Sequence, residues 1–303
     1  MIARRRRIII GRFKPAQNSR KNHASPGRRE PVTMLNNPHD CRHDSQWQDY
    51  SRPVHRHRRV VSVRRLHTIL FIVRLSDLKK ELRASADPER ARNSAWFFKT
   101  GEGQYGHRDR FIGITVPVQR RIARRYVHLP LTDVEKLLAS PIHEHRFVAL
   151  EILVAQYERE NSPAIVDFYL KHTKFINNWD LVDTSAPYIV GQHLLTSPRK
   201  ILYRLAKSKD LWERRIAIVS TQSLIRAGEI EDTFAIAKIL LLDDHDLIHK
   251  AVGWMLREAG KQSAPALVRF LKEHYAQMPR TSLRYAIERF PAERRRRMLV
   301  GRF

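Results

Sequence analysis

A repeat with a period in the mid-thirties is the feature that most limits the folds open to this chain. Five segments begin with a charged residue followed by small or apolar residues, and their first residues are separated by 34, 35, 35 and 34 positions. These first residues are Arg146, Asp180, Arg215, Lys250 and Arg284. A period of this length, with two helices in each repeat, is typical of an α-solenoid. The sequence therefore predicts an all-α fold of stacked helical pairs, in which equivalent positions form a column.

From Leu75 to the C-terminus, apolar residues recur at helical spacing and no long stretch alternates as a strand would. Asn178 is expected to cap a helix, Thr132 and Glu135 have the spacing of a capping box, and 143–145 is expected to be a solvated helix start. After residue 140, helices are predicted near 142–158, 162–173, 178–195, 198–207, 210–227, 231–241, 246–259, 263–274 and 281–289.

The chain is strongly basic, with 57 Lys+Arg against 31 Asp+Glu and a formal net charge of +26. Residues 1–74 contain 18 of the basic and 4 of the acidic residues, so residues 75–303 are basic in their own right. This excess favours a polyanionic partner, nucleic acid before anionic membrane. No apolar run approaches the ~20 residues of a membrane span, and one cysteine fits a reducing compartment. We therefore expect a cytoplasmic protein without a membrane partner.

Residues 1–74 differ from the rest, with Arg runs, scattered Pro and His, and no sustained helical period. They are expected to be mostly disordered. They could be a nucleic-acid-binding arm, an organellar transit segment, or sequence upstream of the natural start. The third explanation is favoured because the helical pattern begins abruptly at Leu75. We therefore divide the chain into an extension, 1–74, and one domain, 75–303.

The column of repeat positions is basic at four places and acidic at one, Asp180, with Asp183 a turn beyond it. On a concave solenoid face, basic residues in phase would follow a nucleic-acid backbone. A carboxylate on such a track repels phosphate, which suggests a chemical role. Trp179 shares a helix face with Asp183, and Trp254 lies one turn beyond Lys250. Two indoles and a carboxylate would stabilise a transient cation, although each feature alone fits a solvated helix face or a packed core.

The other candidate motifs lack residues that a metal site or a known catalytic site requires. His245 and His249 share a helix face but lack the glutamate of a metalloprotease motif and a third ligand. His39, Cys41 and His43 match no closed four-ligand pattern. The sequence has no Gly-rich phosphate loop, serine-hydrolase elbow or paired CxxC motif. We expect no metal and no cofactor.

With these residues in view, the region from Leu75 to the C-terminus resembles the AlkD-type DNA alkylation-repair glycosylases, a family built from HEAT-like helical repeats. The resemblance rests on four segments, of which the last three are specific in this order and spacing. They are Phe97–Gly101, Asn178–Asp183, Leu211–Arg215 and His249–Glu258.

The resemblance implies a curved solenoid of HEAT-like repeats with a basic concave face. It implies a monofunctional glycosylase that hydrolyses the N-glycosidic bond of cationic alkylated purines, of the 3-methyladenine and 7-methylguanine type, in duplex DNA. Family members do not pull the damaged base into a pocket, unlike most glycosylases. Asp183 would stabilise the oxocarbenium-like sugar and position water. Trp179 and Trp254 would pack against the deoxyribose and backbone, and Arg215 would hold a phosphate.

The remaining column residues, Lys250, Arg146 and Arg284, are expected to contact DNA phosphates. Phe97 would flank the lesion where some relatives have a tyrosine, and Asp180 would have a supporting role, either satisfying the helix start or orienting a neighbour. We expect a monomer. The main alternative is a non-catalytic HEAT-repeat scaffold for distorted nucleic acid or a protein, and an RNA-binding repeat protein is less favoured because paired base-reading positions are not evident.

Overall fold

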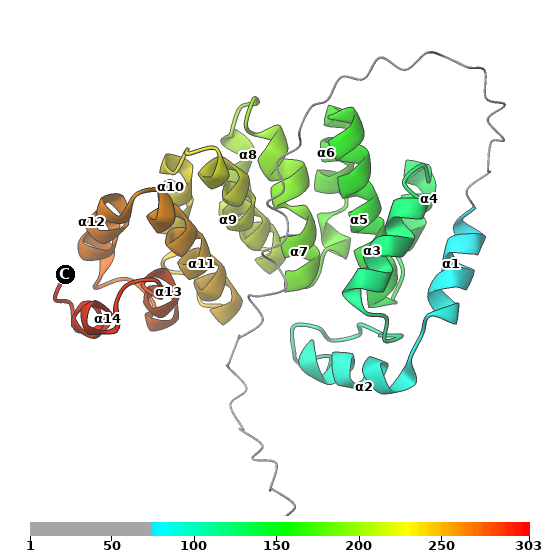
Figure 1. Cartoon of the computed structure of the whole chain (residues 1–303), viewed down its shortest axis with the longest axis horizontal. Coiled ribbons are helices and arrows are strands. Elements are labelled where there is room, and N and C mark those ends of the chain that lie inside the picture. The colour runs from blue at the N-terminus through cyan, green and yellow to red at the C-terminus, as the bar shows by residue number, and fades with distance from the viewer. Residues whose placement is uncertain (1–73) are drawn as a thin grey trace, which may run out of the picture. The chain divides into compact units, whose positions relative to one another are not determined.

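The computed structural model describes residues 74–303, which form an all-α fold (Figure 1). The predicted fold class, a solenoid of stacked helices, is confirmed. The α-helices are α1 (Leu75–Ala84), α2 (Pro88–Phe97), α3 (Val116–Arg125), α4 (Leu131–Leu138), α5 (His143–Glu160), α6 (Pro163–Lys171), α7 (Trp179–Ser185), α8 (Lys200–Ala206), α9 (Leu211–Arg226), α10 (Glu231–Leu240), α11 (Asp246–Gln262), α12 (Ala264–His274), α13 (Arg280–Ala286) and α14 (Ala292–Leu299). Two short turns, η3 (Thr173–Phe175) and η4 (Pro187–Gly191), flank α7.

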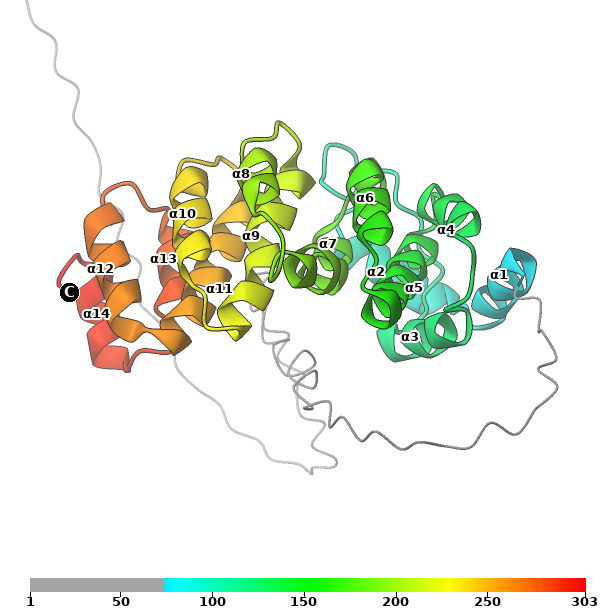
Figure 2. The ribbon, with the colours of Figure 1, turned by 90° about the horizontal axis from the view of Figure 1, so that it is seen from above.

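The helices from α3 to α13 are arranged in two layers. Each of α3, α5, α7, α9 and α11 packs against the next odd-numbered helix, and α4, α6, α8, α10 and α12 cover this layer from one side (Figure 2). The five leading residues of the sequence repeat all fall within the first five residues of α5, α7, α9, α11 and α13. The repeat period thus corresponds to one step along the odd-numbered layer.

The centre of the odd-numbered layer is closely packed. In α5, Phe147, Leu150 and Leu153 are fully buried because α3, α4, α6 and α7 contact it. A helix that is buried on all sides has no need of a polar face, which explains the apolar run in the middle of α5.

Two glycines allow neighbouring elements to approach one another closely. A Cβ atom on Gly253 of α11 would lie 2.5 Å from Cβ of Tyr285 on α13. A Cβ atom on Gly191, at the end of η4, would lie 2.3 Å from the carbonyl oxygen of Ser220 on α9. The π-helical turn η4 begins at Pro187, which has no amide hydrogen to donate to an α-helical bond. The predicted helix 178–195 is therefore α7 continued by this wider turn.

Two local predictions are wrong. Thr132 and Glu135 do not form a capping box, because the chain is already helical at Leu131 and Pro130 occupies the N-cap position without a side-chain cap bond. The segment 143–145 is not solvated, because all three of its side chains are buried at the start of α5.

The predictions for the extension, including those for His39, Cys41 and His43, lie outside the described residues except at Arg74. The division of the chain into an extension and one domain stays a prediction. Within residues 74–303, no helix has both the length and the apolar composition that crossing a membrane requires.

Candidate DNA-repair site

The start of α7 is fixed by Asn178, as predicted. Asn178 is extended (φ −151°, ψ 156°), and its side-chain oxygen accepts a hydrogen bond from the amide of Trp179 at 2.9 Å. The helix then places Trp179 half-buried, Asp180 buried and Asp183 partly accessible along its first turns. Cap and helix together determine the direction in which the two carboxylates point.

Asp183 is held in a two-point ion pair with Arg215 of α9. Nε of Arg215 donates to Oδ1 at 2.9 Å, and Nη2 donates to Oδ2 at 2.8 Å. Nη1 of Arg215 donates to the carbonyl oxygen of Leu247 on α11 at 2.7 Å. The side chain of Asp183 is 11% exposed and that of Arg215 is 6% exposed. Arg215 therefore orients Asp183 and joins three consecutive odd-numbered helices.

Asp183 is an unusually basic carboxylate. Burial raises its pKa; the charge and hydrogen bonds of Arg215 lower it, and the neighbouring charge of Asp180 raises it further. The net pKa lies above the ordinary aspartate value. A carboxylate that binds protons more readily also interacts more strongly with a cation that forms beside it.

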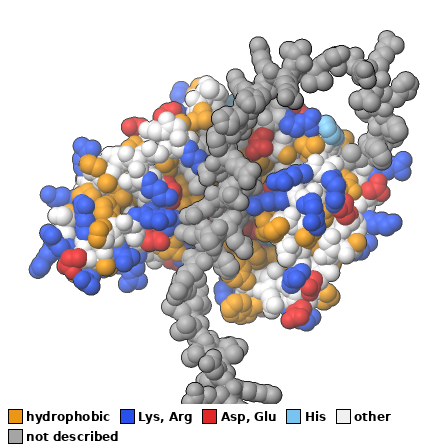
Figure 3. All heavy atoms as spheres, in the orientation of Figure 1, with side chains coloured by type: hydrophobic (Ala, Val, Ile, Leu, Met, Phe, Trp, Pro, Cys, Tyr) orange, Lys and Arg blue, Asp and Glu red, His pale blue; other side chains and the backbone are white. Residues whose placement is uncertain are grey.

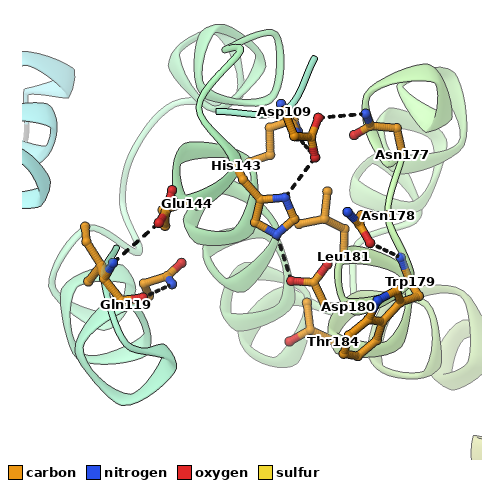
Figure 4. A network of polar contacts seen from close by, with 12 residues as sticks. Asp109, Gln119, His143, Glu144, Asn177, Asn178, Trp179, Asp180, Leu181 and Thr184 are labelled. Carbon is orange, nitrogen blue, oxygen red and sulfur yellow. Dashed lines mark hydrogen bonds and ion pairs between the residues drawn. The ribbon is translucent and has the colours of Figure 1, made fainter. Parts of the chain in front are cut away.

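Asp180 belongs to a separate, buried network (Figure 4). His143, at the start of α5, contacts Asp180 Oδ2 through Nε2 at 2.8 Å and Asp109 Oδ2 through Nδ1 at 3.1 Å. Asp109 also lies 2.7 Å from Nη2 of Arg146 and accepts a hydrogen bond from Asn177 at 3.1 Å. The network joins the loop before α3, the start of α5 and the start of α7.

His143 is held as an imidazolium, because both of its nitrogens face carboxylate oxygens, which only accept hydrogen bonds when ionised. Burial lowers the pKa of His143, but the charge of Asp180 and the hydrogen bonds to Asp109 and Asp180 raise it to about 9. Burial raises the pKa of Asp109, but the hydrogen bond from His143 and the charge of Arg146 bring it below the ordinary value.

Aromatic rings connect this network to Trp179. Phe111 stacks on the ring of His143 at 4.5 Å, and Phe98 lies 5.1 Å from both of these rings. Phe98 also stacks on Trp179 at 5.4 Å, and Phe97 meets Trp179 edge-on at 6.1 Å. The orientation of the Trp179 indole is thus determined by packing against the loop that follows α2.

Tyr105, in that loop, adds a hydroxyl to the surroundings of Trp179. Burial raises the pKa of Tyr105, and a hydrogen-bonding interaction with Trp179 lowers it in part. The ring of Tyr105 also meets Trp212 edge-on at 6.2 Å. The loop holds this position because Gly106 donates to the carbonyl of Lys99 at 3.1 Å and has no room for a Cβ atom.

The structure places the four basic residues of the predicted column in two different environments. Arg146 and Arg215 are buried in ion pairs, so the expectation that the column is a solvent-facing track is wrong at these two positions. Lys250 is 24% exposed and forms an ion pair with Asp246 at 2.9 Å, whereas Arg284 is exposed. Phosphate binding by these residues stays a prediction.

Trp254 is half-buried against the core on α11, and its predicted place beside the sugar stays a prediction.

Sequence reasoning missed His143, Asp109 and Tyr105. A signal for His143 was available, because the apolar run that follows it indicates a helix buried on all sides, and its first turn is then buried too. No comparable signal identifies Asp109 or Tyr105, which occur in a loop with few apolar residues.

Comparison with known proteins bears on the family and the fold of this chain. A model of the family described as "DNA alkylation repair enzyme" matches residues 78–290, well over half of the chain. The chain belongs to this family. A solved structure described as "Predicted DNA alkylation repair enzyme from Enterococcus faecalis" superposes with a TM-score of 0.58 at 20% identity, covering 69% of this chain and 98% of that one. At this identity the similarity shows the fold alone. None of the curated proteins compared matches the sequence.

Family membership gives this chain a DNA-repair role. Among the described residues, no group of three or more His, Cys, Asp or Glu side chains is arranged to hold a metal ion. A cavity of about 510 Å³ lies between α6 and α8, and none of the predicted site residues lines it.

Proposed function

We propose that this chain is a monofunctional DNA N-glycosylase that removes cationic alkylated purines, of the 3-methyladenine and 7-methylguanine type, from duplex DNA. The observation that best supports this proposal is the Asp183–Arg215 pair, an oriented and partly accessible carboxylate one turn beyond Trp179. An ionised carboxylate has about four lone-pair sites, and Arg215 occupies two of them. The other two remain for water or for a developing positive charge.

The chemistry requires little more than charge stabilisation. A cationic base is already a good leaving group, so positive charge develops on the sugar as the glycosidic bond breaks. In this proposal Asp183 stabilises that charge and positions water for attack at the anomeric carbon. Trp179 and Trp254 pack against the deoxyribose and backbone, and Phe97 flanks the lesion. Because Arg215 already donates three hydrogen bonds and its side chain is 6% exposed, its role is to orient Asp183, and any phosphate contact would be secondary.

Asp180 has a supporting role in this proposal. Its carboxylate is buried and bound to His143, so it is poorly placed to meet a sugar. It instead anchors the start of α7 to α5, which fixes the position of Asp183 one turn later. Lys250 and Arg284 are the candidates for phosphate contacts on the same layer. The substrate is duplex DNA, and no partner subunit or cofactor enters the mechanism.

A non-catalytic DNA-binding scaffold is the second candidate, because a buried two-point ion pair can also be purely structural. Release of 7-methylguanine from methylated duplex DNA distinguishes the two. We expect the wild-type chain to release the base and Asp183→Asn to lose release while binding the same duplex within about 3-fold. An Asn variant with wild-type release would refute the role of Asp183. Absence of release by the wild-type chain, with salt-dependent DNA binding intact, would favour the scaffold.

A further inference from the structure

Helix α2 differs from its neighbours because none of its residues is buried. It is nevertheless a well-terminated helix. Asp87 caps it by accepting hydrogen bonds from the amides of Glu89 and Arg90 at 2.9 and 3.0 Å, and Pro88 occupies the first turn. A capped helix that contributes nothing to the core has a free face.

The C-terminal end of α2 presents large apolar side chains to solvent. Trp96 is 70% exposed and Phe97 is 46% exposed, two of the four large hydrophobic residues exposed in the described part of the chain. Hydrophobic side chains gather on the surface in this region (Figure 3). Neighbouring exposed aromatic side chains form a contiguous apolar patch, and contiguous apolar patches are a mark of interaction sites.

The end of α2 is also rigid. Lys99 adopts a left-handed conformation (φ 55°) that ends the helix, and Thr100 bonds the carbonyl of Ala95 through both its amide and its hydroxyl, at 3.2 and 3.1 Å. Gly106 donates back to the carbonyl of Lys99. Trp96 is therefore held outward by a fixed helix end.

Positive charge surrounds this aromatic end. Arg92 and Trp96 have the spacing i, i+4, which places them on one face of α2, and Nζ of Lys99, just beyond the helix, lies 4.7 Å from the centre of the Trp96 ring. The acidic residues Asp87 and Glu89 lie at the other end of the helix, about 12 Å away at 1.5 Å per residue. The face combines a planar aromatic ring with cations, the combination that binds bases and phosphates.

We propose that this face of α2, formed by Arg92, Trp96, Phe97 and Lys99, binds a nucleobase that has lost its partner beside the lesion. Trp96 stacks on the unpaired base while Arg92 and Lys99 contact the flanking phosphates. Phe97 lies between this base and Trp179, whose ring it meets at 6.1 Å. The proposal deepens the proposed function and rests on it for the substrate, damaged duplex DNA. It predicts that the protein favours lesions at which base pairing is weakened.

The test uses the full chain and a duplex with 2-aminopurine opposite a tetrahydrofuran abasic-site analogue, from which no base can be released. Stacking by Trp96 should quench the 2-aminopurine fluorescence. We expect Trp96→Ala to lose the quenching and to bind this duplex about 10-fold more weakly, in line with base–aromatic stacking, while an undamaged duplex changes less than about 2-fold. Trp96→Phe should retain most of both signals.

Leu242→Ala is the matched control, because Leu242 is 77% exposed and lies after α10. Equal losses in the Trp96 and Leu242 variants, or the same loss on damaged and undamaged duplexes, would overturn the proposal. No effect of Trp96→Ala on any duplex would also overturn it and would leave α2 for a protein partner. Trp96-dependent quenching without release of 7-methylguanine from methylated DNA would refute the glycosylase and leave this inference standing.

Discussion

Asp180 and Asp183 lie one turn apart on α7, but their surroundings are opposite in character. Asp180 faces inward, where it shares the imidazolium of His143 with Asp109, and its Oδ1 is buried without a hydrogen-bond partner. Asp183 faces the adjoining helix, where Arg215 binds both oxygens and 11% of the side chain stays exposed. Both acids are neutralised by a cation and both are largely buried, with side chains that are 8% and 11% exposed. The binding partner therefore separates a candidate for chemistry from an anchor: Asp180 is tied to α5 through His143, whereas Arg215 orients Asp183 and leaves a lone pair on each of its oxygens.

The largest expected effect follows from removing the arginine that binds Asp183. Arg215→Met leaves Asp183 without a partner in a largely buried position, and we expect the free energy of unfolding to fall by about 3–5 kcal/mol. Urea denaturation followed by circular dichroism measures the loss. Lys250→Met is the control, because the Asp246 carboxylate that it leaves without its lysine partner is 53% exposed and the loss should be much smaller. Equal losses in the two variants would contradict the special burial of the Asp183 pair.

The second prediction concerns His143, the partner of the buried Asp180. The pKa of His143 rises from 6.5 to about 9 on folding, so its contribution to stability is complete below pH 6.5 and is lost as the pH rises through 9. The shift corresponds to about 3 kcal/mol. We expect the melting temperature to fall between pH 7 and 9.5, and this fall to be much smaller in His143→Gln. The same alkaline slope in both proteins would show that His143 is not the group responsible.

The smallest expected effect is on the rate of base release at acidic pH. The glycosylase needs Asp183 ionised, and its pKa is raised on folding, so base release should decline with falling pH sooner than an ordinary aspartate with a pKa of 3.8 would allow. Single-turnover release of 7-methylguanine between pH 4 and 7 measures this limb, with each sample checked by circular dichroism for folding. A limb at or below the ordinary aspartate pKa would contradict the environment described for Asp183.

The sequence was sufficient to predict the parts of this molecule that depend on local or periodic signals. The 34- and 35-residue spacing corresponds to the odd-numbered layer, and Asn178 caps α7 as its side-chain chemistry predicts. The family resemblance also selected the helix that bears both acids.

The partners of the charged residues could not be predicted in this way. His143 meets Asp180 across 37 residues, and Arg215 meets Asp183 across 32, so each pairing depends on how neighbouring helices are rotated. The sequence period placed Arg146 and Arg215 in one column with Lys250 and Arg284, although the first two are buried and the others are more accessible. A period locates equivalent positions along helices but does not reveal which of them an adjoining helix covers.

The two acids differ in their partners, His143 for Asp180 and Arg215 for Asp183, and base release by a variant of each distinguishes their roles. Single-turnover release of 7-methylguanine from methylated duplex DNA is measured for Asp183→Asn and Asp180→Asn, each at a temperature where the variant is fully folded. We expect Asp183→Asn to slow release at least about 100-fold and Asp180→Asn to slow it less than about 10-fold. Release that survives in Asp183→Asn, or a larger loss in Asp180→Asn, would contradict the assignment of the two carboxylates.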